Sequence, residues 1–215
     1  TVTIDADSME KQTTVVSRTK DFSRADYSIE RATELLDQVA RQLQSSKWFK
    51  DGWLTSVHCF PPPPSEPESV TLHVYKKHWY NDDHRGIHFE TNLGPEQFAT
   101  ELVPVMLHIL HTPTVPGTKI KRIKITQPFV DEIFDTVSVW DGYVFRVGKY
   151  GTQPFSCKLY FTLDDVVDKL TSEIGRMCET LGPTLDLVVL EQVGGATKKG
   201  SNDRQYRSGF ESHEE

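Results

Sequence analysis

The stretch VTLHVYKKHWYNDDHRGIHFETNL, residues 70–93, decides the fold. Apolar and polar side chains alternate at both of its ends, and the Asn, Asp and Gly residues between them favour a turn. The pattern predicts a β-hairpin with a strand over 70–79, a long loop over 80–86 and a second strand over 87–93. Hairpins pair their strands antiparallel, so the stretch favours an α+β fold over a parallel α/β fold.

The alternation sorts the hairpin side chains onto two faces. Leu72 and Val74 share one face of the first strand, and Ile87 and Phe89 share one face of the second, so these residues are expected to pair over the core. The opposite face carries a polar set: His73, Tyr75, Lys77, His88, Glu90 and Asn92. Cross-strand neighbours lie about 5 Å apart at Cβ, so the imidazoles and the carboxylate of this set are close enough to share a site.

Three interpretations of this polar face remain open. Two imidazoles and one carboxylate on adjacent strands can hold Zn²⁺ or Fe²⁺ with positions left for water or substrate. A histidine paired with a glutamate can instead act as a general base, with a tyrosine as hydrogen-bonding acid, because histidine titrates near neutral pH. The same residue types are also common on the solvated face of an antiparallel sheet.

From the sequence we favour a small-molecule site on this hairpin that works by acid–base chemistry. Its predicted catalytic residues are His73, Tyr75, His88 and Glu90. The predicted ligand-binding residues are Trp79, Lys77 and Asn92. No residue is assigned to a metal, and the sequence identifies no cofactor. Trp79 and Tyr80 directly precede an acidic turn and form the aromatic pair least expected to be wholly buried.

Other histidines lie near this hairpin in the sequence or further along it. Five of the eight fall between positions 58 and 88, among them His84 in the loop, where it can belong to a gate over a pocket or simply to the turn. His108 and His111 are three residues apart near the end of a predicted helix, which permits a joint site. A histidine at such a helix end ordinarily interacts with the helix dipole.

Helices are predicted from apolar residues recurring at spacings of three and four. The predicted helices cover 27–46 behind Asp26 or Ser28 as cap, 95–111 with a kink at Pro104, 128–135, and 163–181 with Gly182-Pro183 as the stop. Further strands are predicted over 53–60, 119–125, 139–147, 155–161 and 185–190, and an extended connector over the prolines at 61–64.

A shift of 68 residues lays the first hairpin and its helix over the second. Ile87 then meets Phe155, and Phe98 meets Val166, with almost no identities. We therefore predict an antiparallel sheet built from two ββα units, with pseudo-duplication as a hypothesis, plus an N-terminal helix. The polar set is not repeated in the second unit, so chemistry is expected in the first alone.

The domain organisation follows from composition. Residues 1–26 are polar and predict an N-terminal arm, and residues 194–215 have linker chemistry that predicts a flexible polar C-terminal tail. Between them, 27–193 is predicted to be a single α+β domain, with 27–113 and 114–193 as its sub-units.

Composition and charge bound the function. The 215 residues include 24 Lys+Arg and 31 Asp+Glu, a formal net charge of −7, so nucleic acid is not an expected partner. No apolar run is long enough for a membrane helix. Three cysteines far apart in the sequence favour a reducing compartment, and the expected location is cytoplasmic.

A non-catalytic role is the alternative interpretation of the same sequence. No HExxH, GxSxG or GxGxxG motif is present, while aromatic hairpins and polar arms suit contacts with a protein partner or a second copy of the chain. The alternative function is therefore a protein-interaction or assembly module, with a homo-oligomer as one form that it can take.

Overall fold

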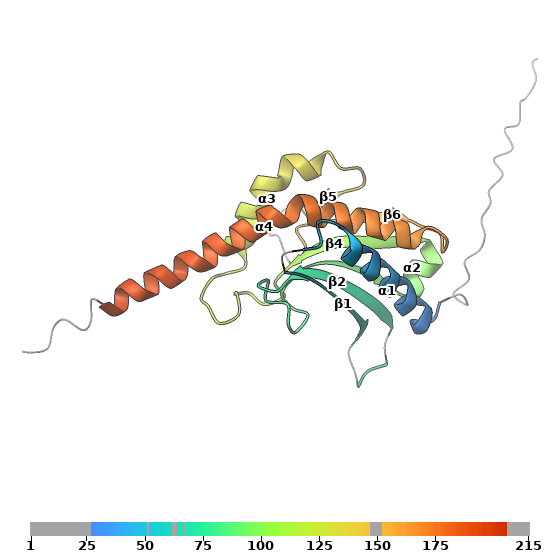
Figure 1. Ribbon diagram of the computed structural model, residues 1–215, viewed down its shortest axis with the longest axis horizontal. Coiled ribbons are helices and arrows are strands. Elements are labelled where there is room, and N and C mark those ends of the chain that lie inside the picture. The colour runs from blue at the N-terminus through green and yellow to red at the C-terminus, as the bar shows by residue number, and fades with distance from the viewer. Residues whose placement is uncertain (1–26, 51, 62–63, 67, 147–151, 206–215) are drawn as a thin grey trace, which may run out of the picture.

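The computed structural model describes residues 27–50, 52–61, 64–66, 68–146 and 152–205, with 195–205 described by backbone alone. Six strands form one antiparallel sheet in the order β1-β2-β3-β4-β6-β5 (Figure 1). The strands are β1 (Trp53–Phe60), β2 (Ser69–Lys76), β3 (Ile87–Leu93), β4 (Leu102–Ile109), β5 (Val144–Phe145) and β6 (Phe155–Tyr160). The helices of the described residues are α1 (Ile29–Ser45), α2 (Pro95–Thr100), α3 (Ile123–Ser138) and α4 (Val166–Gln205). The predicted α+β class with an antiparallel sheet and an N-terminal helix is confirmed.

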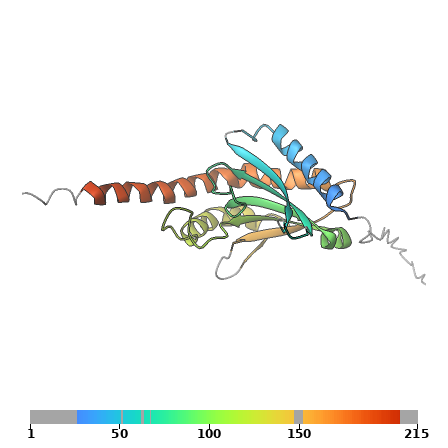
Figure 2. The same cartoon turned by 90° about the horizontal axis from the view of Figure 1, so that it is seen from below.

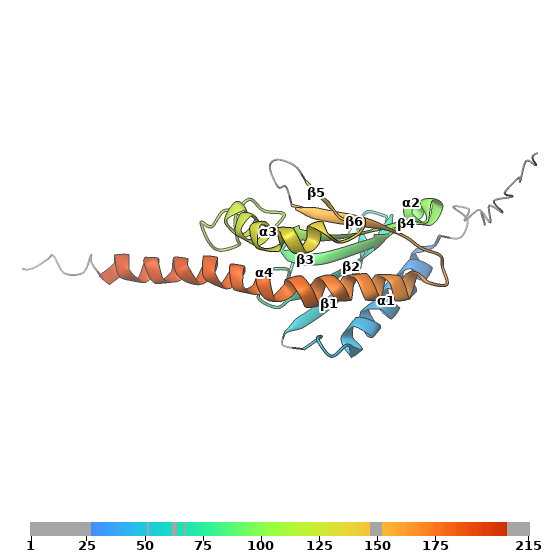
Figure 3. The same ribbon diagram turned by 90° about the horizontal axis from the view of Figure 1, so that it is seen from above.

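The helices divide the molecule into layers. α1 packs on β1 and β2, α4 packs on β3 and β4, and the two helices contact each other, so both cover the same face of the sheet (Figure 2). α3 packs against α4 (Figure 3). The C-terminal part of α4 extends beyond the sheet (Figure 1). No helix in the described part of the chain is both long enough and apolar enough to cross a membrane.

α1 forms where its apolar spacing predicted it. Ser28 is the N-cap, and its hydroxyl accepts a hydrogen bond from the backbone N–H of Arg31 at 3.1 Å, which satisfies one of the free donors of the first turn. Its buried stripe follows the helical period and consists of Ala32, Leu36, Val39, Ala40 and Leu43. Of the two predicted caps, Ser28 is therefore the one used.

The first hairpin is confirmed with its register. Leu72 pairs with Thr91 and Val74 with Phe89, and all four are buried. The strand predicted over 53–60 is also present and pairs with β2. The first hairpin strand ends at Lys76, so Lys77 lies in the following turn and is exposed.

α4 corrects two predictions at once. Gly182-Pro183 does not stop the helix, and the strand predicted over 185–190 is helical. Losing a hydrogen bond at Pro183 costs about 3 kcal/mol, whereas fully burying Leu185 and Val189 contributes about 1.5–3 kcal/mol each. Gly182 serves close packing, because a Cβ there would lie 2.6 Å from the Trp53 ring. Residues 194–205, predicted as tail, continue the helix.

β4 corrects the prediction of a kinked helix over 95–111. α2 ends at Glu101, which has a left-handed φ of 55°, and the chain then forms a strand. Val103, Val105 and Leu107 alternate toward the core, and this period of two overrides the coincidental spacing of three and four. A strand accommodates Pro104, whose carbonyl accepts a hydrogen bond from Thr91 at 2.8 Å.

The second half of the chain is more helical than predicted. The strand expected over 119–125 is instead the approach to α3 and its first turn, and the short helix expected over 128–135 lies within α3. The second hairpin exists as β5 and β6, with Phe145 paired to Phe155. α3 is a helix because its buried residues recur at helical spacing: Ile125, Phe129, Val130, Ile133 and Val137.

The pseudo-duplication is not confirmed. The first hairpin continues into the six residues of α2 and then a strand, whereas the second continues into α4. Leu102 therefore begins a strand while its shifted counterpart Leu170 lies inside a helix. The predicted arm over 1–26 and the last ten residues of the predicted tail lie outside the described residues. The three cysteines are free thiols.

Candidate metal centre

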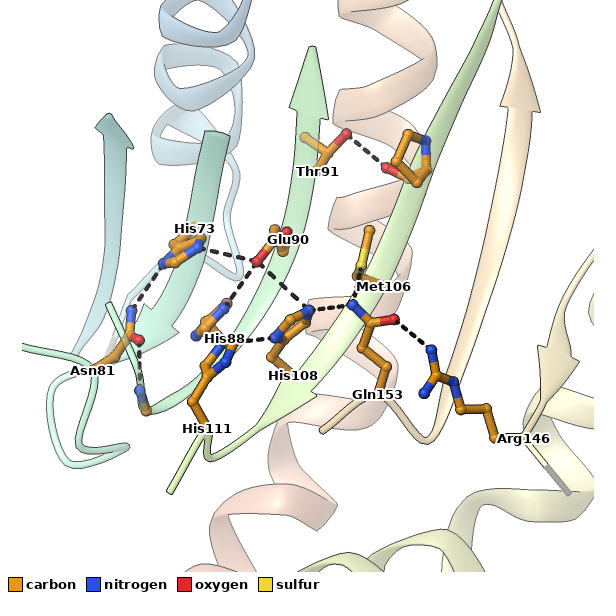
Figure 4. A network of polar contacts seen from close by, with 12 residues as sticks. His73, Asn81, His88, Glu90, Thr91, Met106, His108, His111, Arg146 and Gln153 are labelled. Atoms are coloured by element: carbon orange, nitrogen blue, oxygen red, sulfur yellow. Dashed lines mark hydrogen bonds and ion pairs between the residues drawn. The ribbon is translucent and has the colours of Figure 1, made fainter. Parts of the chain in front are cut away.

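Polar residues converge on the face of the sheet opposite α1 and α4 (Figure 4). Strand pairing sets His73 of β2 directly beside Glu90 of β3, and His88 of β3 directly beside His108 of β4. His58 of β1 points to the same face, because its partner Thr71 is two residues before His73. The register of the meander thus brings four strands to one site.

Glu90 lies at the centre of this site. Its Oε2 is 3.2 Å from His73 Nε2 and 3.1 Å from His88 Nε2, and His108 Nε2 lies 3.7 Å away. The imidazole N–H groups of two different strands therefore donate to a single carboxylate oxygen. These contacts lower the pKa of Glu90 far below its usual range although burial opposes the shift, so Glu90 is an anion at neutral pH.

The imidazole rings lie against one another in a row. His73 and His88 stack with centroids 3.6 Å apart, and His88 and His108 stack at 5.0 Å. The His84 ring, in the loop between β2 and β3, stacks on the His58 ring with centroids 3.9 Å apart. The centroids of His108 and His111 lie 4.7 Å apart. We call the resulting set the histidine cluster: His58, His73, His84, His88, Glu90, His108 and His111.

The loop between β2 and β3 is fixed against the cluster. Gly86 donates its N–H to Asn81 Oδ1 at 3.1 Å, and the Asn81 amide nitrogen lies 3.3 Å from His73 Nδ1. A Cβ at Gly86 would overlap the backbone carbonyl of Tyr80, so glycine is required there. The loop also accepts backbone hydrogen bonds from Leu110 and His111. His84 is thereby placed over the strands.

A second hydrogen-bonded chain reaches the cluster from Arg146, directly after β5, and from Gln153, shortly before β6. Arg146 lies 3.4 Å from Gln153 Oε1, and Gln153 Nε2 lies 2.5 Å from His108 Nε2 (Figure 4). His108 Nδ1 in turn lies 2.9 Å from His111 Nε2. Because the arginine fixes the amide orientation, the amide nitrogen faces His108, whose other ring nitrogen then donates to His111.

Burial keeps the histidines neutral. His88 is fully buried, and desolvation lowers its pKa to about 3. Burial likewise lowers the pKa of His58 to about 4 and that of His108 to about 4, and it lowers the pKa values of His84 and His111. Neighbouring imidazoles add to each of these shifts, since each would repel a second positive charge. Neutral imidazole is the form that binds metal ions.

The cluster contains three groups with the composition of a metal site. Each group offers three ligand atoms that lie within 4.8 Å of one another. The groups are His73–His88–Glu90, His58–His73–His84 and His88–His108–His111. Among the described side chains, His58 Nδ1 and His88 Nδ1 are buried without a hydrogen-bond partner, along with the hydroxyl of Thr171 outside the cluster. A buried polar nitrogen without a partner is costly, so these two nitrogens are candidate ligand atoms.

The sequence-predicted site residues separate into four sets. His73, His88 and Glu90 meet as the hairpin register predicts, and Tyr75 and Asn92 share their face without a contact to Glu90. Lys77 is exposed in the turn that follows β2.

Trp79 lies on the opposite side of the sheet. It is fully buried beside Trp53 and Phe89, and its Nε1–H donates to Asp186 of α4 at 2.7 Å. The expectation that Trp79 and Tyr80 are not wholly buried is therefore wrong for Trp79, whereas Tyr80 is half-buried. Trp79 fills the core and does not reach the cluster.

Four cluster histidines are absent from the sequence-predicted site: His58, His84, His108 and His111. His108 was placed on a helix, and His58 on a strand whose pairing was not predicted. Reading 102–109 by its period of two would have placed His108 on a strand, on the face opposite to that of Val105 and Leu107.

Comparison with protein-family models, with curated proteins and with solved structures gives no match for this chain. The geometry of the histidine cluster therefore carries the functional argument.

Proposed function

We propose that this protein binds a divalent transition-metal ion, with zinc as the best fit, through His73, His88 and Glu90, and that the ion acts on a small molecule. One observation carries the proposal: the ring nitrogens of His73 and His88 converge on one oxygen of the Glu90 carboxylate. All three stand on adjacent, fully paired strands, which hold ligands more rigidly than loops do.

The distances suit an ion of this size. Tetrahedral ligands about 2.05 Å from zinc lie about 3.3 Å from one another. The two ring nitrogens lie 3.2 Å and 3.1 Å from Glu90 Oε2, so small side-chain movements admit the ion. Imidazole and carboxylate ligands favour zinc or iron over magnesium or calcium, which prefer oxygen ligands throughout.

Three protein ligands leave a fourth position for water or substrate, which is the arrangement of catalytic zinc sites. A bound ion lowers the pKa of its water and generates hydroxide near neutral pH. Around the ion, His84 and His111 are exposed and lie at the edge of the cluster, where a small molecule can approach. Hydrolysis of a small molecule is the reaction class that this chemistry favours.

Metal analysis of the full-length protein tests the proposal. The untagged protein is purified without chelator, and bound metal is counted by inductively coupled plasma mass spectrometry and by native mass spectrometry. We expect bound zinc in the wild type and a loss of at least tenfold in zinc affinity for His88→Ala and for Glu90→Gln.

His78→Ala is the matched control, because it also removes one imidazole but not from the cluster. His78 contacts Asp186 of α4 at 3.0 Å and is 44% exposed. Circular dichroism establishes that each variant is folded. Zinc affinities that are equal in the wild type, His88→Ala and His78→Ala contradict the proposal.

A metal-free acid–base site is the second candidate, and one observation favours it. Gly86 fixes the orientation of the Asn81 amide, whose nitrogen donates to His73 Nδ1, so His73 Nε2 carries a proton toward Glu90. His88 donates to the same carboxylate through Nε2, which leaves its Nδ1 as a basic lone pair. A carboxylate that orients a histidine in this way is the arrangement of a general base.

Nuclear magnetic resonance of the ring nitrogens distinguishes the two candidates. In chelator-treated protein, long-range proton–nitrogen spectra are expected to show His88 as the Nε2–H tautomer. Adding one equivalent of Zn²⁺ shifts the His88 and His73 nitrogen resonances if the metal binds there. Resonances that remain unchanged leave the acid–base site as the function.

A further inference from the structure

We infer that the histidine cluster binds two divalent metal ions, one in each of two histidine triads, with Glu90 as a bridging ligand between them. The inference rests on the proposed function and extends its ligand assignment: His73 and His88 bind different ions, and Glu90 contacts both. The first triad is His58, His73 and His84, and the second is His88, His108 and His111. The triads share no residue, so both can be occupied at once.

The two triads are built alike from the fold. The first takes its members from β1, from β2 and from the loop that follows β2. The second takes its members from β3, from β4 and from the segment that follows β4. Within each triad the ligand atoms lie within 4.8 Å of one another, a span that one ion with three nitrogen ligands can close by small ring rotations.

Glu90 lies between the two triads. Its Oε2 is 3.2 Å from His73 of the first triad and 3.1 Å from His88 of the second. A carboxylate has two oxygens and can bind two ions at once. Paired metal ions in enzymes stand about 3.5–4 Å apart, which is within the reach of one bridging carboxylate. The His73 and His88 rings, one from each triad, stack with centroids 3.6 Å apart, so the triads are direct neighbours.

Two further observations mark both triads and not one alone. Each triad contains a buried ring nitrogen with no hydrogen-bond partner, at His58 in the first and at His88 in the second. Each triad also has one histidine held by a side-chain amide, Asn81 on His73 and Gln153 on His108. Each amide thereby holds one ring of its triad in a fixed orientation.

The number of bound ions tests the inference directly. The metal-free full-length protein is titrated with Zn²⁺, and the ions bound at saturation are counted by native mass spectrometry. We expect two ions for the wild type and two for His78→Ala, which leaves the cluster intact. His84→Asn and His111→Ala are each expected to retain one ion.

These variants are chosen to keep the fold. His84 and His111 are exposed, so their loss leaves no cavity in the core. His84 has a left-handed φ of 62°, which asparagine tolerates better than alanine does. A double variant, His84→Asn with His111→Ala, removes one member of each triad and leaves His73, His88 and Glu90 in place.

The outcomes separate the two proposals. One ion in the wild type, with His84→Asn and His111→Ala unchanged from it, overturns the second ion but leaves the single-ion function standing. No bound ion in the folded wild type overturns both. Two ions in both single variants overturn the assignment of the ions to the triads. Two ions in the wild type and one in each single variant support it.

Discussion

The two faces of the sheet bury their side chains in different ways. The face under α1 and α4 packs Leu72, Val74 and Phe89 against helices. This burial stabilises the fold because it removes apolar surface from water. The opposite face buries His73 and His88 around a carboxylate.

Apolar burial is stable whatever the pH, whereas a buried imidazole is stable only while it is neutral and its nitrogens have partners. The face under α1 and α4 therefore stabilises the fold at any pH. The other depends on protons and, by our proposal, on metal.

Acid gives the largest expected difference between the faces. In the unfolded chain the histidines take up protons below about pH 6.5, whereas folding holds the pKa of His58 and His108 at about 4 and that of His88 at about 3. The unfolded state therefore binds more protons below pH 6.5, and stability is lost as the pH falls from 6.5 toward 3.

The low pKa of Glu90 acts in the same direction at still lower pH. Urea unfolding of metal-free protein between pH 7.5 and 4 measures the loss of stability that the buried histidines cause. A midpoint that does not fall over this range contradicts the assignment of buried, neutral histidines.

The helix-covered face was the more predictable one. α1, β1 and the β2–β3 hairpin follow from local periodicity, since each has one apolar and one polar face. β4 was not predicted because its period of two is masked by apolar residues on both faces: Pro104 and Met106 alternate with Val103, Val105 and Leu107, and only His108 is polar. The continuation of α4 beyond Pro183 was not predicted, because contacts with elements distant in the sequence stabilise the helix there and override a local stop signal.

The candidate site was predictable only as far as one hairpin extends. His73, His88 and Glu90 lie on two strands joined by a short loop, so alternation alone brings them together. His58 and His108 join them through the pairings of β1 and β4, which depend on register across the whole sheet. No local pattern records that register, so a cluster of six histidines could not be predicted from alternation within one hairpin.

A cavity in the apolar face gives the next largest effect. Ile174 of α4 is fully buried in the core and is not part of the cluster. Ile174→Ala is expected to lower the free energy of unfolding by about 2–5 kcal/mol, through lost burial and the cavity left behind. Zinc stoichiometry is expected to stay unchanged, as native mass spectrometry can establish. A parallel loss of zinc would show that the two faces are coupled.

Gly175 and Gly182 of α4 test how tightly the apolar face is packed at two points of one helix. Gly182→Ala places a Cβ 2.6 Å from the Trp53 ring, and we expect a loss of about 1–3 kcal/mol from overpacking. Gly175→Ala is the matched control, because its Cβ meets its nearest neighbour, Trp48, at 3.7 Å. Alanine also suits a helix better, so Gly175→Ala is expected to stabilise by about 0.5–1 kcal/mol. Thermal unfolding that ranks the two variants in the opposite order would contradict this packing.

Asn81→Ala gives the smallest expected effect, and it acts on the histidine face. The substitution removes the amide that orients His73 and leaves the Gly86 N–H without its partner. We expect zinc affinity to fall about tenfold, because the substitution frees the His73 ring and removes the anchor of the loop that carries His84. Competition with a chromophoric zinc chelator measures the change. An unchanged zinc affinity would show that the contact between Asn81 and His73 does not contribute to metal binding.

The meander order of β1 to β4 bears on how the protein is made. All members of the histidine cluster lie between residues 58 and 111, so they leave the ribosome before α3 and α4 do. Chains begin to fold as they emerge from their N-terminal side, and pairing between strands that are neighbours in the chain forms with little loop closure. The ligands can therefore gather during translation, while the apolar face still awaits its last helix. If the cluster binds metal as we propose, the ion can therefore bind while the chain is still being made.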